Sequence, residues 1–153
     1  MTTYVAATDA LYGLVSNTWK TSVLPLLGAD AELRFQGVEQ HDRIPGDVFW
    51  GRVSRQTIDS SQASLSACVT NIGKSRYTEY GLIFVQLFGP VADPESLYKL
   101  SRAAQILRNA FRAKEMSGQA TIWFRRARIN ELPQEERFTR LNVVAEFEYD
   151  EIY

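Results

Sequence analysis

Apolar residues near the start of the chain recur at the spacing of a helix. Leu11 and Leu14 fall on one side of a helical wheel, and we predict a helix over residues 8–24 with Thr8 or Asp9 as its N-cap. A proline and a glycine follow directly after this segment, which is typical of a helix end.

The next segments alternate apolar and polar residues, which is the pattern of strands. We predict a short strand over residues 33–37, a second over 49–57 and a third over 63–70, the last with one face in the core. The polar residues 59–62 predict a hairpin connection between the second and third strands. Residues 80–88 are apolar on both faces, which predicts a central strand covered on both sides.

A strong helix start follows at Asp93. Asp93 is the expected N-cap, Pro94 fits the first helical position, and Glu95 favours the positive end of the helix dipole. Gly118 is expected to stop this helix. The apolar residues of the helix repeat at spacings of three and four and so form one stripe, made of Leu97, Leu100, Ala104, Leu107 and Phe111.

Two long strands, over residues 120–129 and 141–149, end the pattern. Strands that are adjacent in sequence and joined by short links favour an antiparallel or mixed sheet. The predicted fold class is therefore α+β, with a sheet of about five to six strands and two main helices packed on it. The sequence contains no internal repeat and no long linker, so we expect one domain over residues 1–153.

The composition excludes several classes of protein. The chain has 17 basic and 18 acidic residues, which does not suit a generally basic nucleic-acid binder. Cys68 is the single cysteine, so no disulfide can form within the chain. No apolar run approaches the roughly 20 residues of a membrane span, and the N-terminus lacks a signal-peptide pattern. We therefore expect a soluble protein that binds no membrane.

The sequence contains no recognisable catalytic constellation. His41 is the only histidine, which excludes a histidine-based triad or a site with several histidine ligands. Cys68 lies in a strand pattern, and we interpret it as a packing residue. Glu146 and Glu148 project from one strand face and resemble a carboxylate pair, but a solvated strand face explains them better. We predict no catalytic residue, no cofactor and no metal site, and hence no enzyme.

Three arginines cluster on the first of the two final strands, at Arg125, Arg126 and Arg128. They are compatible with a phosphate-contacting patch or with an edge strand protected by charge. In a third interpretation, Arg126 and Arg128 share a strand face and form a basic strip close to the acidic strip of Glu146 and Glu148. The two strips would then pair within one subunit or between neighbouring subunits, and we predict Arg125, Arg126, Arg128, Glu146 and Glu148 as a subunit interface.

Two polar segments, residues 38–47 and 130–136, are predicted loops suited to contacting a partner. Phe49 and Trp50 follow the first of them and are either core residues or exposed anchors of a contact. The predicted partner-contacting residues are His41, Asp42, Arg43, Phe49, Trp50, Glu135 and Glu136.

Several blocks of sequence carry a resemblance to a known family and follow one another in its order of elements. The chain resembles, from about residue 5 to its C-terminus, the tail-terminator or tail-completion proteins of long-tailed bacteriophages, including the lambda-type minor tail protein. The blocks are residues 35–38 (FQGV), 49–53 (FWGRV), 80–90 (YGLIFVQLFGP), 103–112 (AAQILRNAFR) and 141–150 (LNVVAEFEYD).

The resemblance implies a virion structural protein. Such a subunit forms a hexameric ring on the finished tail tube, stops its polymerisation and offers the surface to which the neck proteins of the head join. The implied partners are further copies of the chain, the tail-tube protein and the head–tail connector proteins, with DNA only passing through the ring. The implied location is the head-proximal end of the tail, and the host cytoplasm during assembly.

Alternative functions stay open. A head–tail connector or a tail-tube subunit is the nearest, and a small enzyme or a nucleic-acid-binding module would belong to different classes. If the ring interpretation holds, charge reversal at Arg126 and Arg128 is expected to weaken the ring while the monomer stays folded.

Overall fold

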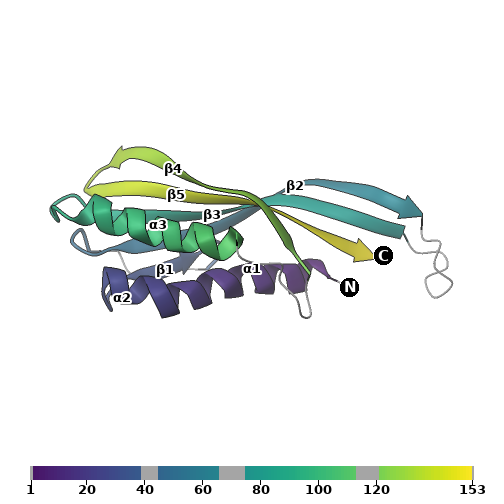
Figure 1. The fold of residues 1–153 in the computed structure, drawn as a ribbon, viewed down its shortest axis with the longest axis horizontal. Helices are drawn as coiled ribbons and strands as arrows, with labels where there is room; N and C mark the ends of the chain where they lie inside the picture. The colour runs from purple at the N-terminus through teal and green to yellow at the C-terminus, as the bar shows by residue number, and fades with distance from the viewer. Residues whose placement is uncertain (1, 39–44, 66–74, 113–120, 153) are drawn as a thin grey trace.

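The computed structural model describes residues 2–38, 45–65, 75–112 and 121–152. Within them, a five-stranded sheet of order β1-β2-β3-β5-β4 carries the helices on one face (Figure 1). β1 and β2 are parallel and all other neighbouring strands are antiparallel, so the sheet is mixed and the predicted α+β class is confirmed. The elements are α1 (Tyr4–Thr18), η1 (Trp19–Val23), α2 (Leu24–Leu27), β1 (Glu32–Phe35), β2 (Trp50–Leu65), β3 (Ser75–Pro90), α3 (Ser96–Arg112), β4 (Trp123–Glu135) and β5 (Phe138–Ile152).

The first helix begins earlier than predicted. The hydroxyl oxygen of Thr3 accepts the N–H of Ala6 at 3.2 Å, so Thr3 is the N-cap. The Thr8 hydroxyl instead donates to the Tyr4 carbonyl at 2.8 Å, inside the helix. The predicted caps, Thr8 and Asp9, are therefore wrong. The periodicity missed the true start because the first two turns bury only small side chains.

β2 runs straight through the polar residues 59–62, which were predicted to form a hairpin connection. These residues pair one by one with β3, beginning with Asp59 opposite Tyr80, and register shifts on either side absorb the irregularities. The prediction is wrong because backbone pairing to β3 holds this segment in the sheet, whatever the polarity of its side chains. Of the predicted third strand, residues 63–65 end β2, and residues 66–70, with Cys68, lie outside the described residues.

β4 is also longer than its apolar pattern. It pairs with β5 as far as Glu135 opposite Phe138, and Glu136 and Arg137 form the turn between the two strands. Glu136 has a positive φ of 50°, the left-handed conformation that tight turns require. The predicted loop over residues 130–136 is therefore mostly strand.

The helices bury one face of the sheet. Ile83, Val85 and Leu87 of β3 are fully buried and belong to the same core cluster as the apolar residues of α1 and α3. A Cβ atom on Gly51 would lie 2.9 Å from the ring of Trp19, so β2 needs a glycine where this residue of η1 packs against it. This face is called the helix-side face below.

Asp93 begins the turn that leads into α3, but the helix itself starts at Ser96, so the predicted N-cap at Asp93 and the predicted first helical position at Pro94 both lie before it. The Asp93 Oδ1 atom accepts the N–H of Glu95 at 2.9 Å, and the Lys99 ammonium group lies 3.3 Å from Oδ2. Leu97 is 57% exposed, so its place in the predicted apolar stripe is wrong; Ser96 takes the inward position there. The residues predicted for this stripe that are buried are Leu100, Ala104, Leu107 and Phe111. Gly118 lies outside the described residues.

The opposite, helix-free face carries no helix of the described chain. Phe88 and Val144 are buried on it although neither belongs to the core cluster. Trp50 stacks on Phe88 with ring centroids 3.9 Å apart, and the Arg52 guanidinium lies 5.5 Å from the centre of the same ring. The prediction that β3 is covered on both sides is corrected: helices cover one face and long side chains of neighbouring strands shield the other.

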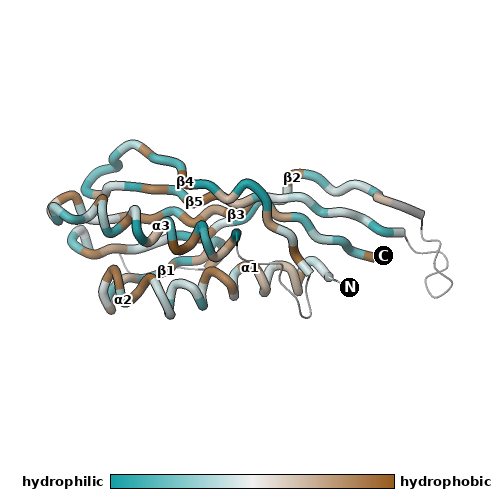
Figure 2. Tube along the Cα trace, viewed as in Figure 1, coloured by the Kyte–Doolittle hydropathy of each residue, from teal (hydrophilic) through white to brown (hydrophobic). Residues whose placement is uncertain are grey.

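The sheet is longer than the helical layer. Residues 58–65 of β2, 75–80 of β3 and 149–152 of β5 extend past α3 and form what we call the arm (Figure 1). Most of the arm is hydrophilic or neutral (Figure 2). Backbone pairing among three strands, and not an apolar core, therefore holds most of the arm together.

Candidate assembly surface

Five charged side chains of the β4–β5 hairpin gather on the helix-free face, and we call them the charged strip. The Arg125 guanidinium lies 2.9 Å from the Glu148 carboxylate. Arg126 and Arg128 share the Glu146 carboxylate at 3.7 and 3.8 Å. The predicted proximity of the basic and acidic residues is therefore observed, with the pairs formed inside one subunit.

A β-bulge explains how three nearly consecutive arginines reach one face. The register of β4 against β5 shifts between Arg125 and Arg128, and Arg126 adopts a left-handed φ of 48°. Ala127 meanwhile turns inward and is buried. A bulge places two residues of one strand opposite one residue of its partner, which turns an additional side chain outward. Residue alternation alone could not predict this arrangement.

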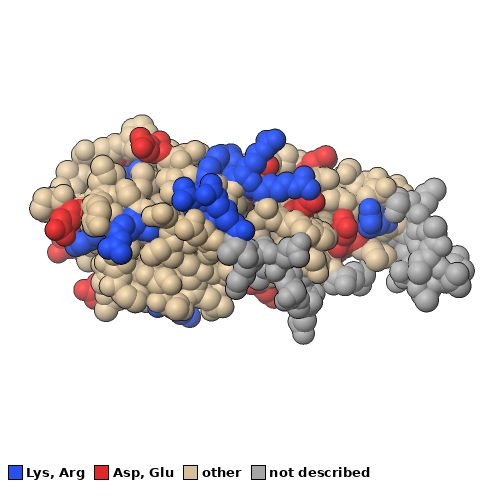
Figure 3. Space-filling view, in the orientation of Figure 1, with Lys and Arg blue, Asp and Glu red and all other residues tan. Residues whose placement is uncertain are grey.

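The charged strip keeps a positive excess. Arg125, Arg126 and Arg128 are 65%, 79% and 44% exposed, so each of these ion pairs contributes at most about 1 kcal/mol. Arg112 of α3 lies against the same strand and donates to the Ala127 carbonyl at 3.2 Å. Three arginines thus lie beside two glutamates, and basic side chains gather over this region (Figure 3). Such a surface suits an acidic partner.

A hollow of about 240 Å³ lies beside the charged strip. One wall is apolar, with Ile58 60% exposed at an irregularity of β2 and Tyr80 39% exposed. Gly81 is required at this point, because a Cβ atom there would lie 2.4 Å from the Phe147 ring. The lining residues are Ile58, Tyr80, Gly81, Arg125, Arg126, Glu146, Phe147 and Glu148.

The aromatic residues predicted as core or anchor differ in their placement. Phe49 is a core residue that is only 7% exposed, with the Lys99 ammonium group 5.6 Å from the centre of its ring. Trp50 is partly exposed on the helix-free face, stacked on Phe88. The burial of Phe49 agrees with the core interpretation, whereas Trp50 is half-buried.

The two segments predicted to contact partners meet at the end of the sheet away from the arm. Gly46 and Asp47 line one hollow of about 530 Å³ together with Glu136 and Arg137. Glu135 is 58% exposed and lies 2.6 Å from the Arg140 guanidinium. We call this end the tip. The remaining predicted contact residues, His41, Asp42 and Arg43, lie outside the described residues.

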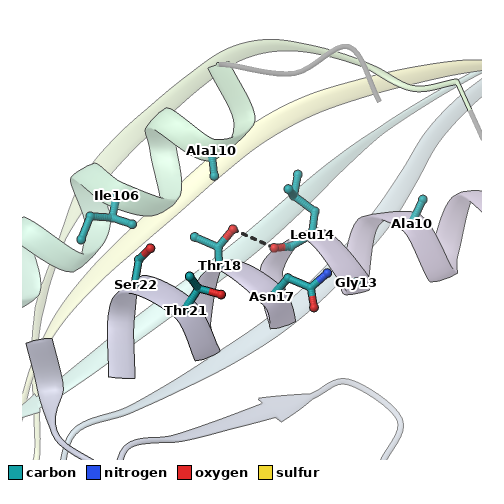
Figure 4. A pocket seen from close by; sticks show the side chains of 9 residues that line it. All are labelled: Ala10, Gly13, Leu14, Asn17, Thr18, Thr21, Ser22, Ile106 and Ala110. Atoms are coloured by element: carbon teal, nitrogen blue, oxygen red, sulfur yellow. Dashed lines mark hydrogen bonds between the residues drawn. The ribbon is translucent and has the colours of Figure 1, made fainter. Parts of the chain in front are cut away.

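A groove of about 580 Å³ between α1 and α3 had no counterpart in the sequence analysis (Figure 4). Its wall on α1 and η1 consists mainly of small or polar side chains at a spacing of four, such as Gly13, Asn17 and Thr21. Ile106 and Ala110 of α3 form the other wall. The spacing of four between these small or polar residues is the sequence signal that could have predicted the groove. None of the residues that line the groove is charged.

Arg55 lies on the helix-side face, close to the base of the arm. Its guanidinium is 4.5 Å from the ring centre of Tyr4 and 5.5 Å from that of Phe147, and it donates to the Thr8 hydroxyl. Burial raises the pKa of Tyr149 nearby, although Arg55 acts in the opposite direction. This arrangement ties α1 to the sheet.

Among the described residues, no group of three or more histidine, cysteine, aspartate or glutamate side chains is arranged to hold a metal ion. No helix in the described ranges is long and apolar enough to cross a membrane. The fold and the surface features together define an α+β protein with a charged strip and apolar surface hollows.

Comparisons with known proteins extend this description. No protein-family model and no curated protein sequence matches the chain. The chain is similar in fold to a chain in the solved structure "Virion of native gene transfer agent (GTA) particle", with a TM-score of 0.50 and 14% sequence identity. The correspondence covers 97% of this chain and 100% of that chain. At this identity the likeness shows a shared fold, from one end of the chain to the other.

Proposed function

We propose that this protein is a structural subunit of a phage-like virion, and specifically a tail terminator. In this role, copies of the chain form a ring on the end of the tail tube, stop its growth and present a joining surface for the neck of the head. The observation that carries the proposal is the end-to-end correspondence with a chain of a virion particle. The sequence resemblance to tail-terminator proteins supplies the finer role.

The surfaces of the molecule support an assembly role. The charged strip supplies an excess of exposed arginines for a neighbouring subunit, and the tip brings together two segments suited to gripping a partner. The partners are further copies of the chain, the tube protein and the neck proteins, and the subunit acts without a cofactor. Growth stops because the outer face of the ring does not fit another tube subunit.

Size-exclusion chromatography with negative-stain imaging tests the proposal, on the chain alone and on the chain mixed with its tube protein. We expect discrete rings, either free or seated at the ends of tubes whose length they limit. Long filaments of the chain alone would identify a tube subunit and contradict the proposal. Tubes that elongate unhindered in the presence of the chain would also contradict it.

A further inference from the structure

The arm carries a small acidic surface on its helix-side face. Tyr77 lies directly opposite Glu151, and Glu79 directly opposite Tyr149, in the antiparallel pairing of β3 with β5. Directly paired residues share a face, and Tyr149 belongs to the helix-side core cluster, so all four residues lie on that face. Tyr77 therefore lies between two carboxylates, and we call Tyr77, Glu79 and Glu151 the acidic arm face.

The carboxylates of this surface are available to a partner. Glu79 accepts the hydroxyl of Ser60, and neither Glu79 nor Glu151 forms an ion pair with any residue that the structure describes. Both side chains are partly exposed. Of the five charged side chains in the described part of the arm, only Arg76 is basic. The arm is thus acidic although the whole chain is nearly neutral.

The acidic arm face and the charged strip cannot meet within one molecule, because they lie on opposite faces of the same sheet. Arg125 pairs in register with Glu146, next to Val144 on the helix-free face, whereas Glu79 and Glu151 lie on the helix-side face. Opposite charges on opposite faces fit a head-to-tail contact, in which each copy offers a different surface to each neighbour. Such a contact, repeated, closes into a ring or continues as a helix.

We propose that the acidic arm face of one copy docks on the charged strip of the next copy. Tyr77 enters the hollow of about 240 Å³ beside Ile58 and Tyr80, and the flanking carboxylates pair with the exposed arginines of the strip. An aromatic side chain between two carboxylates thus meets a hollow that has one apolar wall and is edged by two arginines and by their partners Glu146 and Glu148. This inference rests on the proposed ring and names the two surfaces that form it.

Reciprocal charge reversal tests the contact. One variant carries Arg126→Glu and Arg128→Glu on the strip, and the other carries Glu79→Lys and Glu151→Lys on the arm. Each alone is expected to raise the dissociation constant of the contact at least tenfold, which corresponds to about 1.4 kcal/mol. The variant Lys20→Glu/Asp30→Lys, which changes two exposed charges elsewhere, is the matched control and should assemble like wild type.

Mixing the two reversed variants gives the decisive measurement. In the mixture, a native arm meets a native strip at one contact, and a lysine arm meets a glutamate strip at the next, so every contact is complementary. Native mass spectrometry should therefore show rings that contain the two variants in equal number, although neither variant forms rings alone. Circular dichroism of each variant checks that the monomer is folded.

The outcomes separate this inference from the proposed function. If wild type assembles, free or at tube ends, and the reversed variants assemble equally well, the contact is wrong and the ring proposal stands. If the reversed variants fail singly and also in the mixture, the contact is likewise wrong. If only the strip variant is impaired, and the impairment is a loss of affinity for duplex DNA, the charged strip is a nucleic-acid surface and not a subunit contact. If wild type shows no rings in either setting, both proposals fall.

Discussion

Gly81 lies where β3 leaves the helical layer and enters the arm, and no larger residue fits there. A Cβ atom at this position would lie 2.4 Å from the Phe147 ring and 2.6 Å from the backbone oxygen of Gln56. The ring could tilt away, but the oxygen belongs to the β2 backbone and cannot move without disturbing the pairing of β2 with β3. Gly81→Ala should therefore be destabilising although it adds only one methyl group.

Overpacking of this kind costs about 1–3 kcal/mol in the free energy of unfolding. Unfolding in urea, followed by circular dichroism under conditions where the protein is monomeric, measures the loss. With a slope of about 1–3 kcal/mol per molar urea, a loss of about 2 kcal/mol lowers the midpoint by roughly 1 M.

Gly13 provides a control of opposite sign. It lies inside α1, and a Cβ atom there would meet nothing within 4 Å. Gly13→Ala should therefore stabilise the protein by about 0.5–1 kcal/mol through helix propensity alone. The close approach at Gly81 would be refuted if Gly81→Ala is as stable as wild type in an experiment where Gly13→Ala shows its gain in stability.

Two further substitutions test the body of the fold. Leu107 is 1% exposed in the core between α3 and the sheet, so Leu107→Ala should cost about 2–5 kcal/mol of unfolding free energy, and an unchanged urea midpoint would contradict this packing. The N–H of Glu95 holds the pKa of Asp93 below its ordinary value of 3.8, so Asp93 contributes stability above that pH and loses it as the pH falls through the folded-state pKa. Melting temperatures should therefore show Asp93→Asn less stable than wild type at neutral pH, with the difference shrinking below about pH 4. A difference independent of pH would exclude a stabilising role for the Asp93 charge.

The fold class was predictable because most of its signals are local. The turn at Asp93 that leads into α3 depends on a few consecutive residues, and the stripe of α3 depends on a repeat that survives one misassigned position, Leu97. The extent of the strands was not predictable. β2 and β4 continue through polar residues, since hydrogen bonds to a neighbouring strand define them and these partners are distant in sequence.

The candidate surface was predictable in part for a similar reason. Two adjacent strands joined by a short link predict that Arg126 and Arg128 lie close to Glu146 and Glu148, and both arginines do pair with Glu146. The bulge that turns Arg126 outward and the hollow beside Gly81 depend on register, which one sequence does not reveal. The acidic arm face was missed because residues 59–62 were interpreted as a turn, which left no arm.

The arrangement of the charged surfaces suggests how one small subunit can serve two kinds of partner. The charged strip lies at the middle of the sheet and the acidic face on the arm, whereas the tip, with Glu135 and Glu136, lies at the opposite end (Figure 1). The 15 residues of β5 span roughly 50 Å of extended chain, several times the Debye length of about 10 Å at 0.1 M salt. Charges at the tip and on the arm therefore do not influence each other through solvent. Under the proposed function, contacts between neighbouring copies of the chain and contacts with a different partner should therefore be separable by mutation. The proposed terminator role needs this separation, because the protein would bind both copies of itself and a different partner.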